Sequence, residues 1–83
     1  MALYFLSYDL RKKRDYQRLY DELKKFNAVK ILESTWCLNH SNTSATEITK
    51  HFMQFIDDDD GLVVSEVKDW ASIGTLKTPK DLP

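Results

Sequence analysis

The sequence predicts an α+β fold in which two helices cover one face of a four-stranded antiparallel sheet. Strand-like segments alternate with two segments whose apolar residues recur at helical spacing, and this gives the order β-α-β-β-α-β. The first segment, residues 2–9, is apolar on both faces, which is typical of a strand in the middle of a sheet. The chain has 83 residues, and this length favours a single domain.

The first strand is predicted over residues 2–9, and its side chains alternate between two faces. One face holds Leu3, Phe5 and Ser7, and the other holds Tyr4, Leu6 and Tyr8. A helix is predicted next, with Asp15 as a reasonable N-cap and Asn27 as the residue that ends it. Its apolar stripe consists of Tyr16, Leu19, Tyr20, Leu23 and Phe26.

Residues 29–39 are strand-like throughout, which is long for one strand in so small a domain. A break near residues 33–35 would give two short strands, although no Gly or Pro marks it. Ser44 and Glu47 have capping-box spacing and predict the start of a second helix. Its apolar stripe consists of Ala45, Ile48, Phe52, Phe55 and Ile56. A further strand is predicted within residues 62–70.

This element order is the ferredoxin-like βαββαβ sandwich. We expect one domain over residues 1–83, with a core at about residues 2–69 and a tail over residues 70–83. The tail is predicted to hold a short extra strand near residues 73–76, before two prolines break regularity. Because the helices cover only one face of the sheet, a second copy of the chain is expected on the other face.

The composition limits the classes of function. The formal net charge is −1, which argues against a strongly electrostatic nucleic-acid binder. Residues 1–30 carry eight basic and four acidic side chains, a sum of +4, whereas residues 31–83 carry four and nine, a sum of −5. No apolar run suits a membrane span. The only cysteine, Cys37, is expected to be a small buried hydrophobe, so a cytoplasmic protein without a disulfide or zinc site is predicted.

Asp9 is the candidate catalytic and metal-binding residue, because it lies where a central strand ends and ligands can approach. Mg²⁺ prefers oxygen ligands and often uses only one or two protein carboxylates. A two-fold dimer could bring two copies of Asp9 together, and a shared metal could then activate water against a phosphodiester. The alternative is that Asp9 forms a salt bridge with Arg11 or Lys12 in the following loop.

The run after Asp9 is the candidate nucleic-acid surface. Its basic residues are Arg11, Lys12, Lys13 and Arg14, with Arg18 one turn into the helix. Tyr8 and Tyr16 could stack on bases, although Tyr16 also belongs to the apolar stripe of the helix. The alternative is an ordinary solvated loop. Residues 57–60 lack EF-hand spacing and are expected to form a solvated acidic turn, and no glycine-rich phosphate loop or small-molecule cofactor site is evident.

Two segments resemble a known family. The segment LYFLSYDL, residues 3–10, resembles the first strand of the small CRISPR-associated adaptation protein Cas-two and of its toxin-like relative VapD. The segment KILESTW, residues 30–36, resembles the second signature of that family. The matching positions are Lys30, Ile31, Ser34 and Trp36. Leu32 and Thr35 depart from the signature, which commonly has Gln and Val there. The closest likeness is to the short SinR-like proteins of this group.

The resemblance implies a ferredoxin-like fold, a homodimer and a strand break at Ser34. It implies that residues 73–76 add a strand to the partner's sheet and that Asp9 is the metal-binding carboxylate. Some family members are metal-dependent ribonucleases or deoxyribonucleases, whereas others hold DNA as scaffolds. The expected function is therefore a Mg²⁺-dependent endonuclease acting on RNA or DNA, with Mn²⁺ as the alternative cation and Tyr8 and Ser34 in supporting roles. The rival is a non-catalytic dimeric scaffold that binds nucleic acid or protein.

Overall fold

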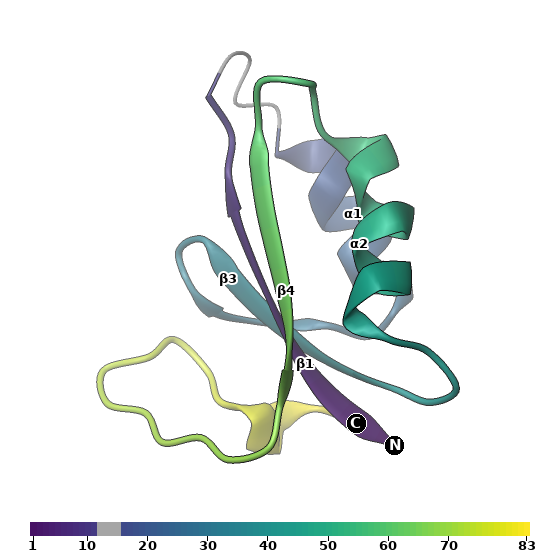
Figure 1. The fold of residues 1–83 in the computed structure, drawn as a ribbon. Coiled ribbons are helices and arrows are strands. Elements are labelled where there is room, and N and C mark those ends of the chain that lie inside the picture. The colour runs from purple at the N-terminus through teal and green to yellow at the C-terminus, as the bar shows by residue number, and fades with distance from the viewer. Residues whose placement is uncertain (12–15) are drawn as a thin grey trace.

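The structure is a computed structural model that describes residues 1–11 and 16–83. Its elements are β1 (Ala2–Asp9), α1 (Gln17–Lys25), β2 (Val29–Leu32), β3 (Thr35–His40), α2 (Ala45–Phe52), the 3₁₀ turn η1 (Met53–Phe55), β4 (Gly61–Val67) and the 3₁₀ turn η2 (Pro79–Asp81). The four strands form one antiparallel sheet in the order β2-β3-β1-β4. Both helices lie on one side of the sheet (Figure 1). The predicted ferredoxin-like fold is confirmed.

β1 is a central strand, as its two apolar faces predicted. It pairs with β3 on one side and with β4 on the other. Tyr4, Leu6 and Tyr8 point toward the helices and are buried, whereas the intervening side chains are only partly buried. The core between sheet and helices consists of Tyr4, Leu6, Tyr8, Leu10, Leu19, Leu23, Trp36, Leu38, Ile48 and Phe52.

The helix ends follow the expected local chemistry in part. Asn27 has φ 57°, a left-handed conformation that Asn tolerates well, and it follows the end of α1 as predicted. The Ser44 hydroxyl accepts the Glu47 N–H at 3.2 Å, so the predicted cap of α2 is present. α2 ends at Phe52, and the rest of its predicted apolar stripe lies in and just after η1. Asp15 lies outside the described residues, and the N-cap of α1 is Tyr16, which makes no side-chain cap hydrogen bond, so the prediction of Asp15 as N-cap is wrong.

The predicted break in the long strand segment is confirmed. A tight turn at Glu33 and Ser34 separates β2 from β3, although neither residue is a turn-forming Gly or Pro. The pairing register between these strands shifts between Lys30 and Leu32, which is the signature of a bulge at Ile31. The bulge ends regular pairing before the turn and so helps to define where the hairpin closes.

The C-terminal tail forms no strand over residues 73–76, so that prediction is wrong for this structure. The tail runs irregularly past Gly74, which has φ 69°, and a left-handed residue interrupts extended backbone. One backbone hydrogen bond joins it to β2, from the Leu76 N–H to the Ile31 carbonyl at 2.9 Å. Figure 1 shows the tail on the side of the sheet opposite the helices.

The tail covers part of the face that no helix covers. Cys37 is fully buried and Ile31 is 4% exposed, yet neither belongs to the core between sheet and helices. A groove of about 240 Å³ is lined by Phe5, Ile31 and Leu32 from the sheet and by residues 70–79 from the tail. The expected cover by a second copy is therefore supplied in part by the chain itself.

Candidate functional site

Asp9 lies at the end of the central strand, on the helix-free face. Leu6 and Tyr8 of β1 point toward the helices. Because successive side chains of a strand point to opposite faces, Asp9 lies on the same face as Phe5 and Ser7. Its carboxylate is 69% exposed, and Oδ2 accepts a hydrogen bond from Arg11 Nε at 3.0 Å. The salt bridge to Arg11, which the sequence offered as the alternative to a metal-ligand role, is thus present.

Arg11 connects Asp9 to the turn before β4. Its backbone N–H donates to Asp60 Oδ1 at 2.7 Å, and its guanidinium lies 3.4 Å from the Asp59 carbonyl oxygen. The second oxygen of the Asp60 carboxylate accepts the Asp57 N–H at 2.8 Å. The acidic turn is therefore partly built into the structure rather than simply solvated.

Gly61 leaves room for the Arg11 guanidinium. Gly61 stands opposite Asp9 in the pairing of β1 with β4. A Cβ at this position would lie 3.1 Å from a terminal nitrogen of Arg11, closer than most real Cβ contacts. A shallow hollow of about 240 Å³ opens beside the pair and is lined by Ser7, Tyr8, Asp9, Arg11, Gly61, Leu62 and Val63. It presents one acid and one base next to apolar surface.

Tyr8 and Ser34 support this strand end from the helix side and from the hairpin. The Tyr8 N–H donates to the Ser34 carbonyl at 3.1 Å, which extends the pairing of β1 to the β2–β3 turn. The Tyr8 hydroxyl lies 2.7 Å from the Tyr20 hydroxyl and 3.1 Å from the Glu33 carbonyl oxygen. Burial and the bond to Tyr20 raise the pKa of Tyr8 above its ordinary value, so the phenol stays neutral. Its role here is structural.

A comparison with protein families identifies the chain's relatives. The family model described as CRISPR associated protein Cas2 matches residues 1–72. The chain belongs to the Cas2 family. No solved structure matches it significantly. Cas2 family membership confirms the resemblance drawn from residues 3–10 and 30–36, and it supports a CRISPR-associated function related to nucleic acid.

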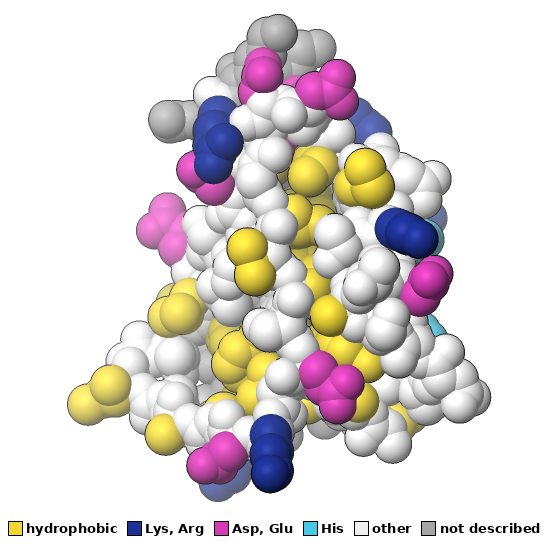
Figure 2. Space-filling model, viewed as in Figure 1, with side chains coloured by type: hydrophobic (Ala, Val, Ile, Leu, Met, Phe, Trp, Pro, Cys, Tyr) yellow, Lys and Arg dark blue, Asp and Glu magenta, His cyan; other side chains and the backbone are white. Residues whose placement is uncertain are grey.

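In this Cas2 family member, the basic residues are only partly gathered at the site. Arg11 lies beside Asp9, whereas Arg18 on α1 donates to the Gln54 carbonyl at 2.8 Å and ties the two helical segments together. The predicted phosphate contacts Lys12, Lys13 and Arg14 lie outside the described residues. On the face in Figure 2, acidic and basic side chains are interspersed. Stacking by Tyr16 is disfavoured, because its ring packs against Tyr8 and Tyr20.

The donor set tests whether one chain fits a metal ion. Within residues 1–11 and 16–83, no group of three or more His, Cys, Asp or Glu side chains is arranged to hold one. Asp9 offers the hard oxygen donor that Mg²⁺ prefers, and Mg²⁺ commonly keeps several waters and uses one or two carboxylates. One chain would therefore supply one carboxylate of a two-carboxylate site, and the Asp9 of a second copy would supply the other.

Two hydrogen-bonded pairs that join distant segments were not predicted from the sequence. One is the bond from the Arg11 backbone to Asp60, across 49 positions. The other joins Glu22, which is 8% exposed, to His51, whose Nε2 lies 2.6 Å from the carboxylate. This bond, with a smaller contribution from Lys25, holds the pKa of Glu22 below its ordinary range despite burial. The only sequence signal was the placement of both residues on helices.

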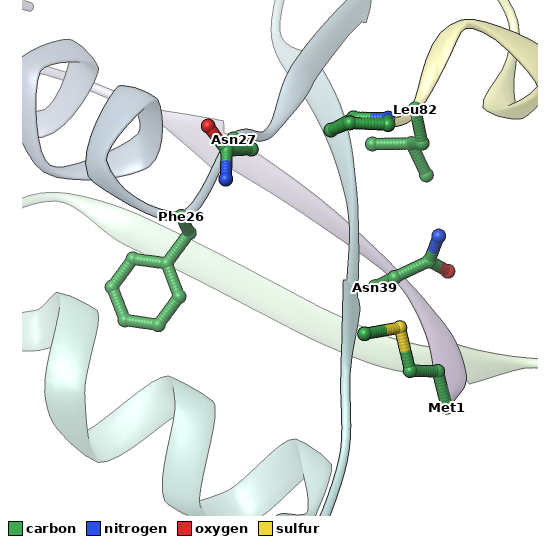
Figure 3. A pocket seen from close by; sticks show the side chains of 6 residues that line it. Met1, Phe26, Asn27, Asn39 and Leu82 are labelled. Carbon is green, nitrogen blue, oxygen red and sulfur yellow. The ribbon is translucent and has the colours of Figure 1, made fainter.

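The remaining hollows lie away from Asp9. A cavity of about 80 Å³ lies where the chain ends meet the end of α1, between Met1, Phe26, Asn39 and Leu82 (Figure 3). This cavity lies at the start of β1 and Asp9 lies at its end, so the two are about 25 Å apart, given ~3.3 Å per strand residue. Its volume is well below the roughly 300 Å³ of typical ligand pockets.

In the part of the chain that the structure describes, no helix is long and apolar enough to cross a membrane.

Proposed function

We propose that the protein is a cytoplasmic homodimer that cleaves nucleic acid at a metal site shared by two copies of Asp9. The observation that carries the proposal is the placement of Asp9. It is an exposed carboxylate at the end of the central strand, on the face that no helix covers. Membership in the Cas2 family adds support, because it points to a function related to nucleic acid.

The surface around Asp9 supports the dimer. Val63 stands opposite Ser7 on β4 and is 65% exposed, and it lines the same hollow as Asp9. The tail covers the other part of this face, around Cys37. A second copy related by a two-fold axis would cover Val63 and bring the two strand ends together, because a two-fold interface uses the same patch from both chains.

The chemistry that we propose divides between the two acids and the nearby base. The two Asp9 carboxylates would hold Mg²⁺, or Mn²⁺ as the alternative cation. A metal held there would supply Lewis-acid assistance to the attack of water on a phosphodiester. Arg11 offers five N–H donors suited to a phosphate, and the predicted contacts Lys12, Lys13 and Arg14 would extend this surface.

The test compares wild type with Asp9→Asn on RNA and DNA, with Mg²⁺ or Mn²⁺. Asn keeps the size of the side chain but removes the charge, so we expect cleavage to fall at least tenfold. Glu66→Gln is the matched control, because Glu66 is an exposed carboxylate on β4 toward the other end of the strand. Equal cleavage by wild type and Asp9→Asn, or none by either, would refute the catalytic proposal. Sedimentation as a monomer at micromolar concentration would refute the dimer.

The second candidate is a dimeric scaffold that binds nucleic acid or protein without cleaving it. The Asp9–Arg11 salt bridge favours it, because a carboxylate engaged by arginine is a poorer metal ligand. The scaffold predicts binding without cleavage. Affinity for nucleic acid that falls steeply with salt indicates phosphate contacts, whereas no binding at low salt leaves a protein partner.

A further inference from the structure

Arg11 is fixed to the fold by its backbone and only lightly by its side chain. The backbone N–H bonds to the Asp60 carboxylate, which is itself bonded to the Asp57 N–H. The guanidinium, in contrast, lies on the surface, with its side chain 61% exposed and Asp9 69% exposed. An ion pair this exposed contributes little to stability. Movement of the Arg11 side chain would break its long 3.4 Å contact with the Asp59 carbonyl oxygen, but the 2.7 Å backbone bond to Asp60 would stay in place.

We propose that Arg11 is a displaceable counter-ion for Asp9. In the free protein its guanidinium holds the carboxylate, and a divalent cation that binds Asp9 takes its place. The released guanidinium then contacts a phosphate of nucleic acid at the hollow beside it. This inference rests on the proposed function and deepens it. It assigns two roles to Arg11: it pairs with Asp9 while no cation is bound, and it binds the phosphate once a cation has taken its place.

The electrostatics of the hollow favour this exchange. A phosphate that approaches Asp9 alone is repelled by the carboxylate, whereas a phosphate beside a cation and a free arginine meets two positive charges. The planar guanidinium can bind a phosphate through two parallel N–H bonds, a stronger arrangement than its contact with Asp9 through Nε alone. Gly61 leaves the side of the guanidinium open, since any larger residue there would approach it closely.

The cation would displace Arg11 from Asp9, and the phosphate would bind the released guanidinium. The binding of the cation and the binding of nucleic acid are therefore linked through Arg11. Removal of the counter-ion exposes Asp9, so cation binding to Arg11→Gln should tighten by about two- to fivefold, the range expected for an exposed pair. In wild type, cation and nucleic acid should tighten each other's binding by equal factors, because linkage between two binding equilibria is reciprocal. In Arg11→Gln this mutual effect should shrink, because the group that serves both ligands is gone.

The experiment measures Mn²⁺ binding by the paramagnetic signal of the free ion, and binding of a short RNA and a short DNA duplex by fluorescence anisotropy. Four proteins are compared: wild type, Arg11→Gln, Asp9→Asn and Lys68→Gln. Lys68→Gln removes one exposed positive charge just beyond the far end of β4, about 23 Å from Gly61 given the rise per strand residue. It therefore separates a local counter-ion from a general change in charge. Unfolding curves confirm that each variant is folded.

The expected result is tighter Mn²⁺ binding by Arg11→Gln alone and weaker binding by Asp9→Asn. Mn²⁺ binding to Arg11→Gln no tighter than to wild type, with Asp9→Asn still weakened, overturns the counter-ion role and leaves the metal site of the proposed function standing. An equal gain in Arg11→Gln and Lys68→Gln overturns it in the same way. Mn²⁺ binding unaffected by Asp9→Asn, or no Mn²⁺ binding by any of the four, overturns the proposed metal site and the counter-ion together.

Discussion

The single cysteine can report whether the tail covers the helix-free face in solution. Cys37 pairs with Phe5 across β1 and β3 and is fully buried, although it lies outside the core between sheet and helices. Burial raises the pKa of the Cys37 thiol to about 11 from its ordinary 9.0, and the nearby charge of Asp81 in the tail adds to the increase. A thiol held in this way should react slowly.

The perturbation is Leu76→Pro, which removes the N–H that donates to the Ile31 carbonyl. The Leu76 side chain is 67% exposed, so Leu76→Ala is a matched control that keeps the N–H and loses little packing. A lost backbone hydrogen bond costs about 1 kcal/mol, which raises the population with an open tail roughly fivefold. Full release of the tail sets the upper limit of the effect. The pKa of Cys37 would then return to its ordinary 9.0, which alone would raise the thiolate population ~100-fold.

The assay follows alkylation of Cys37 under dilute conditions, with iodoacetamide in excess and at constant pH. Wild type and Leu76→Ala should react at similar slow rates, and Leu76→Pro should react about fivefold faster. Equal rates for Leu76→Pro and Leu76→Ala would show that this bond does not hold the tail. A wild-type rate as fast as that of a cysteine peptide would refute the covered face altogether.

Three further predictions test how the helices are held together, capped and packed in the core. Glu22→Gln should lower the free energy of unfolding in urea by about 1 kcal/mol at pH 7 through loss of the charged bond to His51. Because the pKa of Glu22 is lowered in the folded protein, this stabilisation is fully present above the ordinary pKa of 4.5 and is lost as the pH falls through the folded pKa. A difference in unfolding free energy between wild type and Glu22→Gln that persists in strong acid would contradict this assignment. Ser44→Ala should cost about 1 kcal/mol by the same measurement, and no loss would mean that the Glu47 N–H finds another acceptor. Phe52→Ala should cost about 3–5 kcal/mol, whereas a cost below that of Ser44→Ala would place Phe52 outside the core.

The sequence predicted what local patterns encode. Apolar residues on both faces of the segment identified β1 as a central strand, and the spacing of Ser44 and Glu47 identified the start of α2. No Gly or Pro marks the break at Ser34, and its position follows from the family resemblance and the length of the segment. Periodicity alone overestimated α2, because apolar residues of a 3₁₀ turn can continue the stripe of a helix.

The environment of the candidate site could be predicted only in part. The pairing of Asp9 with Arg11 spans two positions, and the sequence offered it as an alternative. The bond from Arg11 to Asp60 depends on how β4 aligns with β1, and that register brings together residues far apart in the chain. The position of the tail was also beyond prediction, because one backbone bond and irregular packing leave no periodic pattern in the sequence.

The tail and the proposed dimer both cover parts of the helix-free face. The tail covers the part around Cys37, and the part with Asp9 and Val63 is left open. A second copy that uses only the open part leaves Cys37 buried, so alkylation should stay slow at protein concentrations that favour the dimer. A second copy that needs the whole face must displace the tail, and alkylation should then accelerate as the dimer forms. The rate at Cys37 therefore distinguishes the two interfaces, and only the first leaves the tail in place while two copies of Asp9 meet.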